Sequence, residues 1–330
     1  MPSRPIAVWH YHHHWIETGK PPAPRPEAVA LSTAERAQEA AELSNQLREK
    51  GESAEPQRIG AAYRLASIGD SALAVEHLKV ALYNDRESVR RAATYGLIAV
   101  GADATPALLE AAVSPIKWVR KAGVYALGDA SPLTAQTLEI ISDRLQHDAS
   151  VYVRAVAAGS LGCMGRRAVA TGDGVELLPG CLDALLDSLA REENRLAMDR
   201  VQQRSIKFVR PTDDCDVCEG GGIDLGLDRF KPVRSAVREN ALWSIVILCS
   251  HGTAFTGDTL GRTIAVLRQI VQQEKNVFSV GFAMDALTRL AHLPARSTTG
   301  GGASDDEVNE EIVALRSDLE EILGQSPVRG

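Results

Sequence analysis

Apolar and small residues recur along the chain in one pattern. Residues 89–97 read Val-Arg-Arg-Ala-Ala-Thr-Tyr-Gly-Leu, related runs begin at Val119 and Val153, and a fainter copy begins at Val237. The valine, the small residues three and four positions later and the leucine one turn further share one face of a helix. Counted from Gln57, a degenerate first copy, the steps to the next three are 32, 30 and 34 residues. This period predicts pairs of helices, each joined by a turn.

A single pair of such helices cannot bury its apolar stripe alone, so the pairs must stack. The pattern therefore predicts an all-α solenoid of stacked antiparallel helix pairs. The helices expected in the regular part are residues 32–50, 56–68, 71–84, 86–100, 106–113, 116–127, 133–146 and 150–164. Further helices are expected at residues 175–203, 232–248, 259–273, 277–290 and 307–323. In the long run at 175–203, the charges from Glu192 onward indicate a solvated extension.

Two segments depart from the pattern. Residues 6–11, extended by the histidines that follow, have the β-branched and aromatic content of a strand and precede a proline-rich linker. Residues 204–231 have little helical patterning, and a loop of that length inside a solenoid is usually functional or disordered. The predicted division has five parts. They are an N-terminal His/Pro-rich segment (1–31), a first repeat block (32–165), a long helix with a Cys-containing loop (166–231), a second repeat block (232–295) and a linker with an acidic helix (296–330).

Composition narrows the class of protein. The formal charge is −7, from 36 basic and 43 acidic residues, which argues against a protein that mainly grips nucleic-acid phosphates. No apolar run approaches the roughly 20 residues of a membrane span, and the start is unlike a signal peptide. Five cysteines, an odd number, fit a reducing compartment. We therefore expect a cytoplasmic protein.

The Val-Arg-x-x-Ala-x-x-x-Leu-Gly pattern at this period resembles HEAT repeats, specifically the short type found in phycobilin lyases. The resemblance covers residues 52–165 and, more loosely, 233–295. We expect a scaffold or adaptor that binds a protein partner. An accessory subunit of an enzyme is one form that this role could take. The candidate binding residues on the concave face are Arg90, Arg120, Arg154 and Arg238. The same arginines also face the turn between the two helices, where Asp85 and Asp148 precede their copies, so Asp–Arg ion pairs within a repeat or contacts with the helix end are the structural alternatives.

The N-terminal segment offers a candidate metal site. On a strand, His10, His12 and His14 would share one face, and imidazole is a good ligand. Residues 4–15 also resemble the closing strand of phytanoyl-CoA dioxygenase-type enzymes, most clearly in the run from Arg4 to Tyr11. That resemblance implies that Arg4 binds the 2-oxoglutarate carboxylate and that a dioxygenase-type enzyme is a partner. The iron ligands of that family should lie upstream of such a strand, so an autonomous oxygenase is not expected.

Cys215 and Cys218 have the spacing of half a zinc site or of a redox pair. A zinc site would be completed by Cys249 and His251 or by neighbouring aspartates, and a loop with free thiols is the simpler reading. The surrounding acidic residues disfavour redox chemistry because they would raise the thiol pKa. Zinc and iron are thus the candidate metals. The alternative to a non-enzymatic scaffold is a metal-dependent, non-heme iron enzyme or enzyme subunit, followed by a HEAT-like lyase or glycosylase.

Overall fold

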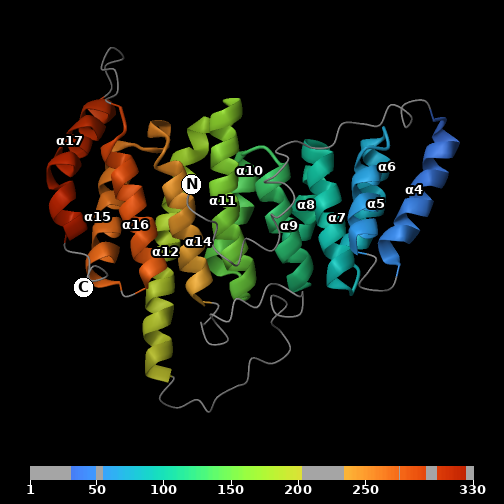
Figure 1. Ribbon diagram of the computed structural model, residues 1–330, viewed down its shortest axis with the longest axis horizontal. Coiled ribbons are helices and arrows are strands. Elements are labelled where there is room, and N and C mark those ends of the chain that lie inside the picture. The colour runs from blue at the N-terminus through green and yellow to red at the C-terminus, as the bar shows by residue number, and fades with distance from the viewer. Residues whose placement is uncertain (1–30, 50–54, 203–233, 275, 295–302, 325–330) are drawn as a thin grey trace. The chain divides into compact units, whose positions relative to one another are not determined.

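The computed structural model describes residues 31–49, 55–202, 234–274, 276–294 and 303–324 (Figure 1). Every regular element within these ranges is helical, which confirms the all-α prediction. The described residues form two compact units, which we call the first unit (residues 31–131) and the second unit (residues 132–324). The strand expected at residues 6–11 lies outside the described residues.

The first unit consists of three antiparallel helix pairs (Figure 1). Its elements are α4 (Thr33–Arg48), α5 (Glu55–Ala66), α6 (Ser71–Leu82), α7 (Glu87–Val100), η2 (Gly101–Ala104), α8 (Thr105–Ala112) and α9 (Lys117–Ala130). The second helices of the pairs, α5, α7 and α9, pack on one another in sequence order. A capping box starts α4, because Ser32 and Glu35 each accept a hydrogen bond from the other's backbone N–H.

The predicted apolar stripe forms the core of this unit. Val89 and Leu97 are fully buried, and so is Leu127. Small residues on the same helices allow close approach: a Cβ atom on Gly123 would lie 2.6 Å from the backbone nitrogen of Ala112. The recurrence of Ala and Gly in the pattern is thus explained by helix contact.

The second unit continues the alternation of first and second helices. Its elements are α10 (Ala135–His147), α11 (Val151–Thr171), η3 (Val175–Leu177), α12 (Leu178–Gln202), α14 (Arg234–Leu248), η4 (Gly252–Ala254), α15 (Gly257–Gln273), α16 (Val277–Ala291) and α17 (Ala303–Gly324). Helix α12 packs against α10, α11 and α14 (Figure 1). It is therefore the first helix of the pair completed by α14, and residues 203–233 connect the two helices of one pair.

Helix α11 is longer than predicted. It runs through Gly165 to Thr171 and ends at Gly172, whose φ of 84° suits a glycine. Gly165 does not end the helix because it is a packing position: a Cβ there would lie 2.5 Å from Leu248 Cδ2. The extension adds Gly165 to the contact between α11 and α14, which also includes Ala155, Ala158 and Gly162.

Helix α17 covers the end of the second unit. It packs on α15 and α16, with Val308, Ile312, Leu315 and Ile322 buried. The guanidinium group of Arg316 donates to the main-chain oxygens of Ala291 and Leu293, which satisfies carbonyls at the end of α16. Helix α17 thus caps the end of the second unit.

One described stretch, Glu87–Ala112, is long and apolar enough to cross a membrane by length and composition alone, although charged residues interrupt it. It is two helices, α7 and α8, separated by Gly101 with a φ of 80° and by η2. Most of it is buried against α5, α6 and α9. These contacts are those of two buried helices of the repeat core.

Candidate binding surface

The signature arginines of the first unit bind the turn that precedes their own helix. Arg90 Nη1 donates to the main-chain oxygens of Asn84 at 2.9 Å and Asp85 at 2.6 Å. Arg120 Nη1 makes the same pair of bonds to Ser114 and Pro115, at 2.9 and 3.0 Å. The predicted helix-end contact is therefore confirmed, with carbonyl oxygens as acceptors.

Arg154 makes these turn contacts and adds an ion pair. Its Nη1 donates to the main-chain oxygen of Asp148 at 3.0 Å, and its Nε lies 2.9 Å from Glu192 Oε1 on α12. The side chains are 9% and 3% exposed. The expectation that Glu192 belongs to a solvated extension is thus wrong, because Glu192 is the buried partner of Arg154.

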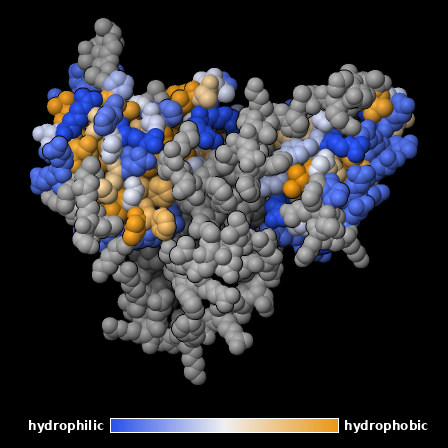
Figure 2. All heavy atoms as spheres, viewed as in Figure 1, coloured by the Kyte–Doolittle hydropathy of each residue, from blue (hydrophilic) through white to orange (hydrophobic). Residues whose placement is uncertain are grey.

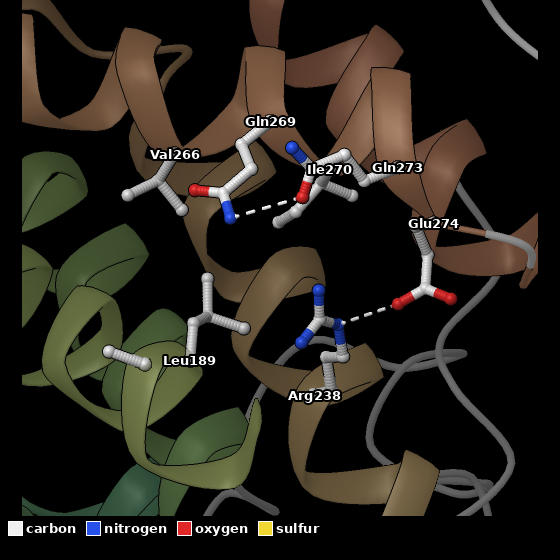
Figure 3. Close-up of a pocket in the computed structure, with 8 residues that line it drawn as sticks. Leu189, Arg238, Val266, Gln269, Ile270, Gln273 and Glu274 are labelled. Atoms are coloured by element: carbon white, nitrogen blue, oxygen red, sulfur yellow. Dashed lines mark hydrogen bonds and ion pairs between the residues drawn. The ribbon is translucent and has the colours of Figure 1, made fainter. Parts of the chain in front are cut away.

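Arg238 also reaches the first helix of the next pair, because its Nε lies 3.2 Å from Glu274 Oε2 at the end of α15. Its side chain is 9% exposed. Figure 3 shows the guanidinium group in a pocket between α12, α14 and α15. The pocket is about 110 Å³ and is lined by Leu189, Ala190, Arg238, Val266, Gln269, Ile270, Gln273 and Glu274. Small-molecule sites usually measure about 300–1,000 Å³, so this pocket suits a single side chain better than a cofactor.

A second surface feature is the edge where the first helix of a pair turns into the second, which we call the turn edge. In the first unit, its exposed apolar side chains are Val80, Tyr83, Val113 and Ile116, with exposures of 37–58%. Lys79 on α6 pairs with Glu110 on α8, so these turns are neighbours. In the second unit, Val277 and Phe278 occupy the turn edge at the start of α16, with exposures of 60% and 54%.

Most large exposed apolar side chains of the described residues lie on the turn edge. The exception is Val313, on the outer face of α17. On the side drawn in Figure 2, apolar surface forms small separate patches among polar residues. The large exposed apolar side chains of the described residues are therefore concentrated on the turn edge.

Burial shifts the pKa of several ionisable groups. Burial raises the pKa of the Cys181 thiol to about 12 and raises that of Cys249 further. Burial also raises the pKa of Asp183, and neighbouring Arg262 only partly offsets it, while burial lowers the pKa of His251. Cys163, Cys181 and Cys249 are buried free cysteines, and the raised pKa of the Cys181 and Cys249 thiols disfavours the reactive thiolate near neutral pH.

The other predicted site residues lie outside the described residues: Arg4, His10, His12, His14, Cys215 and Cys218. Within the described ranges, no three histidine, cysteine, aspartate or glutamate side chains are grouped to hold a metal ion. Zinc and iron binding therefore stay predictions. The concave-face role of Arg90, Arg120, Arg154 and Arg238 is also untested, although each has a partner inside its own unit.

Sequence reasoning missed Glu192, Glu274 and the turn edge. The two glutamates follow their arginines by 38 and 36 residues, so a search for acids one repeat after each arginine would have found them. The turn edge carried a signal in Val113 and Ile116, because apolar residues in a short turn have no core to enter. The stripe pattern drew attention to helix interiors instead.

Comparison with known proteins supports the repeat architecture. Residues 75–162 match the family model described as HEAT repeats. No curated protein matches the chain. One solved structure, described as an engineered protein, is 15% identical, with 76% of this chain and 95% of that chain covered and a TM-score of 0.38. A second engineered protein is 17% identical, with 84% and 77% covered and a TM-score of 0.29. The chain thus contains HEAT-like repeats, and the finer resemblances to phycobilin lyases and dioxygenases stay predictions.

Proposed function

We propose that this HEAT-like repeat protein is a scaffold that binds a protein partner along its turn edge. The observation that carries the proposal is the gathering of exposed Val80, Tyr83, Val113 and Ile116 on adjacent turns of the first unit. Single exposed apolar residues are normal on a protein surface, whereas a group on one edge is typical of an interaction site.

The physical argument favours a protein over other partners. The turns are held in place because the Arg90 and Arg120 side chains donate hydrogen bonds to their main-chain oxygens. A rigid apolar edge loses little conformational entropy on binding. The net charge of −7 gives no general attraction for nucleic acid. Helical repeats commonly use an extended surface for such contacts.

The test uses a matched pair of variants. The double substitution Val113→Asp and Ile116→Asp places charge on the turn edge, and Val313→Asp places it on an equally exposed apolar residue of α17. A partner is first captured from the native host, identified and purified. We expect the double variant to weaken its binding roughly tenfold or more and Val313→Asp to leave it unchanged. Unchanged binding by the double variant would show that the partner does not bind at the turn edge.

The predicted resemblance of residues 4–15 makes a dioxygenase-type enzyme the first candidate to mix directly with the purified chain. In that case, the chain would serve as an accessory subunit rather than as the catalyst. Titration calorimetry with the wild-type chain and the same two variants would measure the contact. An enzyme that binds equally to all three would not be using the turn edge.

A further inference from the structure

The pocket around Arg238 sets this arginine apart from the other three. Arg90, Arg120 and Arg154 each direct Nη1 to carbonyl oxygens of the preceding turn. Within the described part of the chain, the partner of Arg238 is Glu274, through Nε. The Nε–Oε2 separation is 3.2 Å, but Nε lacks hydrogen-bond geometry to that oxygen. The ion pair therefore holds one side of the guanidinium group without using its terminal nitrogens.

Those terminal nitrogens face the pocket. Figure 3 shows the guanidinium group directed between Leu189 and the side chains of α15, with Glu274 on its other side. Leu189, Val266 and Ile270 supply apolar walls, and Gln269 Nε2 donates to Gln273 Oε1 at 3.3 Å across the mouth. A group that enters here would meet charged donors at the base and an amide at the rim.

We propose that the Arg238 pocket receives the carboxylate of an acidic side chain from the protein partner. The planar guanidinium group presents paired N–H donors that match a carboxylate, and one arginine can hold two carboxylates on different edges. Arg238 lies in the second turn of α14, whose N-terminus also favours negative charge. The inference rests on the proposed scaffold function and specifies the partner's chemistry.

The neighbouring surface extends this specification. Val277 and Phe278 follow Glu274 by three and four residues, and Asn276 links the segment to α14 through a 3.0 Å bond to Glu239 Oε1. A partner segment that runs from the pocket toward the start of α16 would meet these two exposed apolar side chains. Apolar residues beside the acidic residue would suit that path.

The experiment uses two peptides and the full chain. N-acetyl-Leu-Glu-Leu-amide and its Leu-Gln-Leu counterpart are titrated while the Arg238 Nε–Hε NMR signal is followed, assigned from its loss in Arg238→Gln. We expect a saturable shift with the Glu peptide and binding roughly tenfold weaker with the Gln peptide. Equal responses to both peptides, or no response to either, would overturn the proposal.

A second variant distinguishes loss of the pocket from a folding defect. Val266→Phe fills the mouth of the pocket and leaves the Arg238–Glu274 ion pair in place, so the Arg238 signal remains visible. We expect it to abolish the peptide-induced shift, and a retained shift would overturn the proposal. The two proposals can fail separately. If the peptides do not bind but partner binding still depends on Val113 and Ile116, the pocket proposal is rejected and the scaffold function stands.

Discussion

At the residue scale, the small positions of the repeat decide how closely its helices approach. A Cβ atom on Gly123 would lie 2.6 Å from Ala112 N and 2.8 Å from Ala111 C, both backbone atoms of α8. Backbone cannot rotate aside as a side chain can. By contrast, a Cβ on Gly60 in α5 would meet nothing within 4 Å. These two glycines therefore separate the effect of packing from that of helix propensity.

We predict that Gly123→Ala and Gly60→Ala change stability in opposite directions. The first should lower the free energy of unfolding by about 1–3 kcal/mol, because α8 and α9 must move apart. The second should raise it by about 0.5–1 kcal/mol, because alanine is the better helix former. Urea titrations followed by circular dichroism would measure both. A Gly123→Ala variant as stable as the wild type would mean that α8 and α9 are not in this close contact.

Residue-level prediction from the sequence succeeded where neighbours are close along the chain. Val89, Ala93 and Leu97 share a helical face by spacing alone, and all three are buried. The burial of Glu192 could not be predicted from spacing, because a glutamate in a charged run usually faces solvent. Its burial depends on Arg154, 38 residues away, which only the stacking of the pairs brings near.

At the element scale, ion pairs between neighbouring helices differ in burial. Arg154 and Glu192 join α11 to α12 with side chains 9% and 3% exposed. Arg262 joins α15 to α12 through Asp183 and Asp187, and Arg262 and Asp187 are 44% and 59% exposed. Water screens the second link but not the first. Two acids on the same helix therefore provide a matched comparison.

We predict that Glu192→Ala costs about 3 kcal/mol of stability and Asp187→Ala less than about 1 kcal/mol. Removing Glu192 leaves a buried arginine without its carboxylate. The loss should fall at the low end of the range for buried pairs because Arg154 keeps its bond to the Asp148 oxygen. Thermal and urea unfolding of both variants would measure the difference. Equal losses would show that burial does not decide the strength of these links.

The order and type of the helices were predictable from periodicity, with ends that differ by a few residues. The pairing of α12 with α14 was not, because residues 203–233 separate them in sequence and obscure the repeat. The packing of α12 on α14 establishes the pairing, and Ser244 Oγ joins α14 to the preceding second helix, α11, by donating to the Ala158 oxygen at 2.8 Å. Such a contact has no local signature in the sequence. The predicted domain boundaries stay a prediction.

At the scale of the whole molecule, a repeat array needs an end that does not recruit more repeats. Helix α17 carries eight acidic residues and one arginine, a net charge equal to the −7 of the whole chain. Its apolar face is buried on α15 and α16, and Arg268 pairs with Asp318 at 3.0 Å. Apart from exposed Val313, the outward face is thus acidic, and its negative charge opposes the stacking of a second copy at this end.

We predict that removal of α17 makes the chain self-associate. A chain that ends at residue 301 exposes the apolar faces of α15 and α16 that Val308, Ile312, Leu315 and Ile322 cover. It also leaves the carbonyl oxygens of Ala291 and Leu293 without Arg316. Light scattering coupled to size-exclusion chromatography should report a larger mass for this chain than for a control that ends at residue 324. Equal masses, together with equal melting temperatures, would show that α17 is not needed as a cap and would leave its acidic face without a structural role.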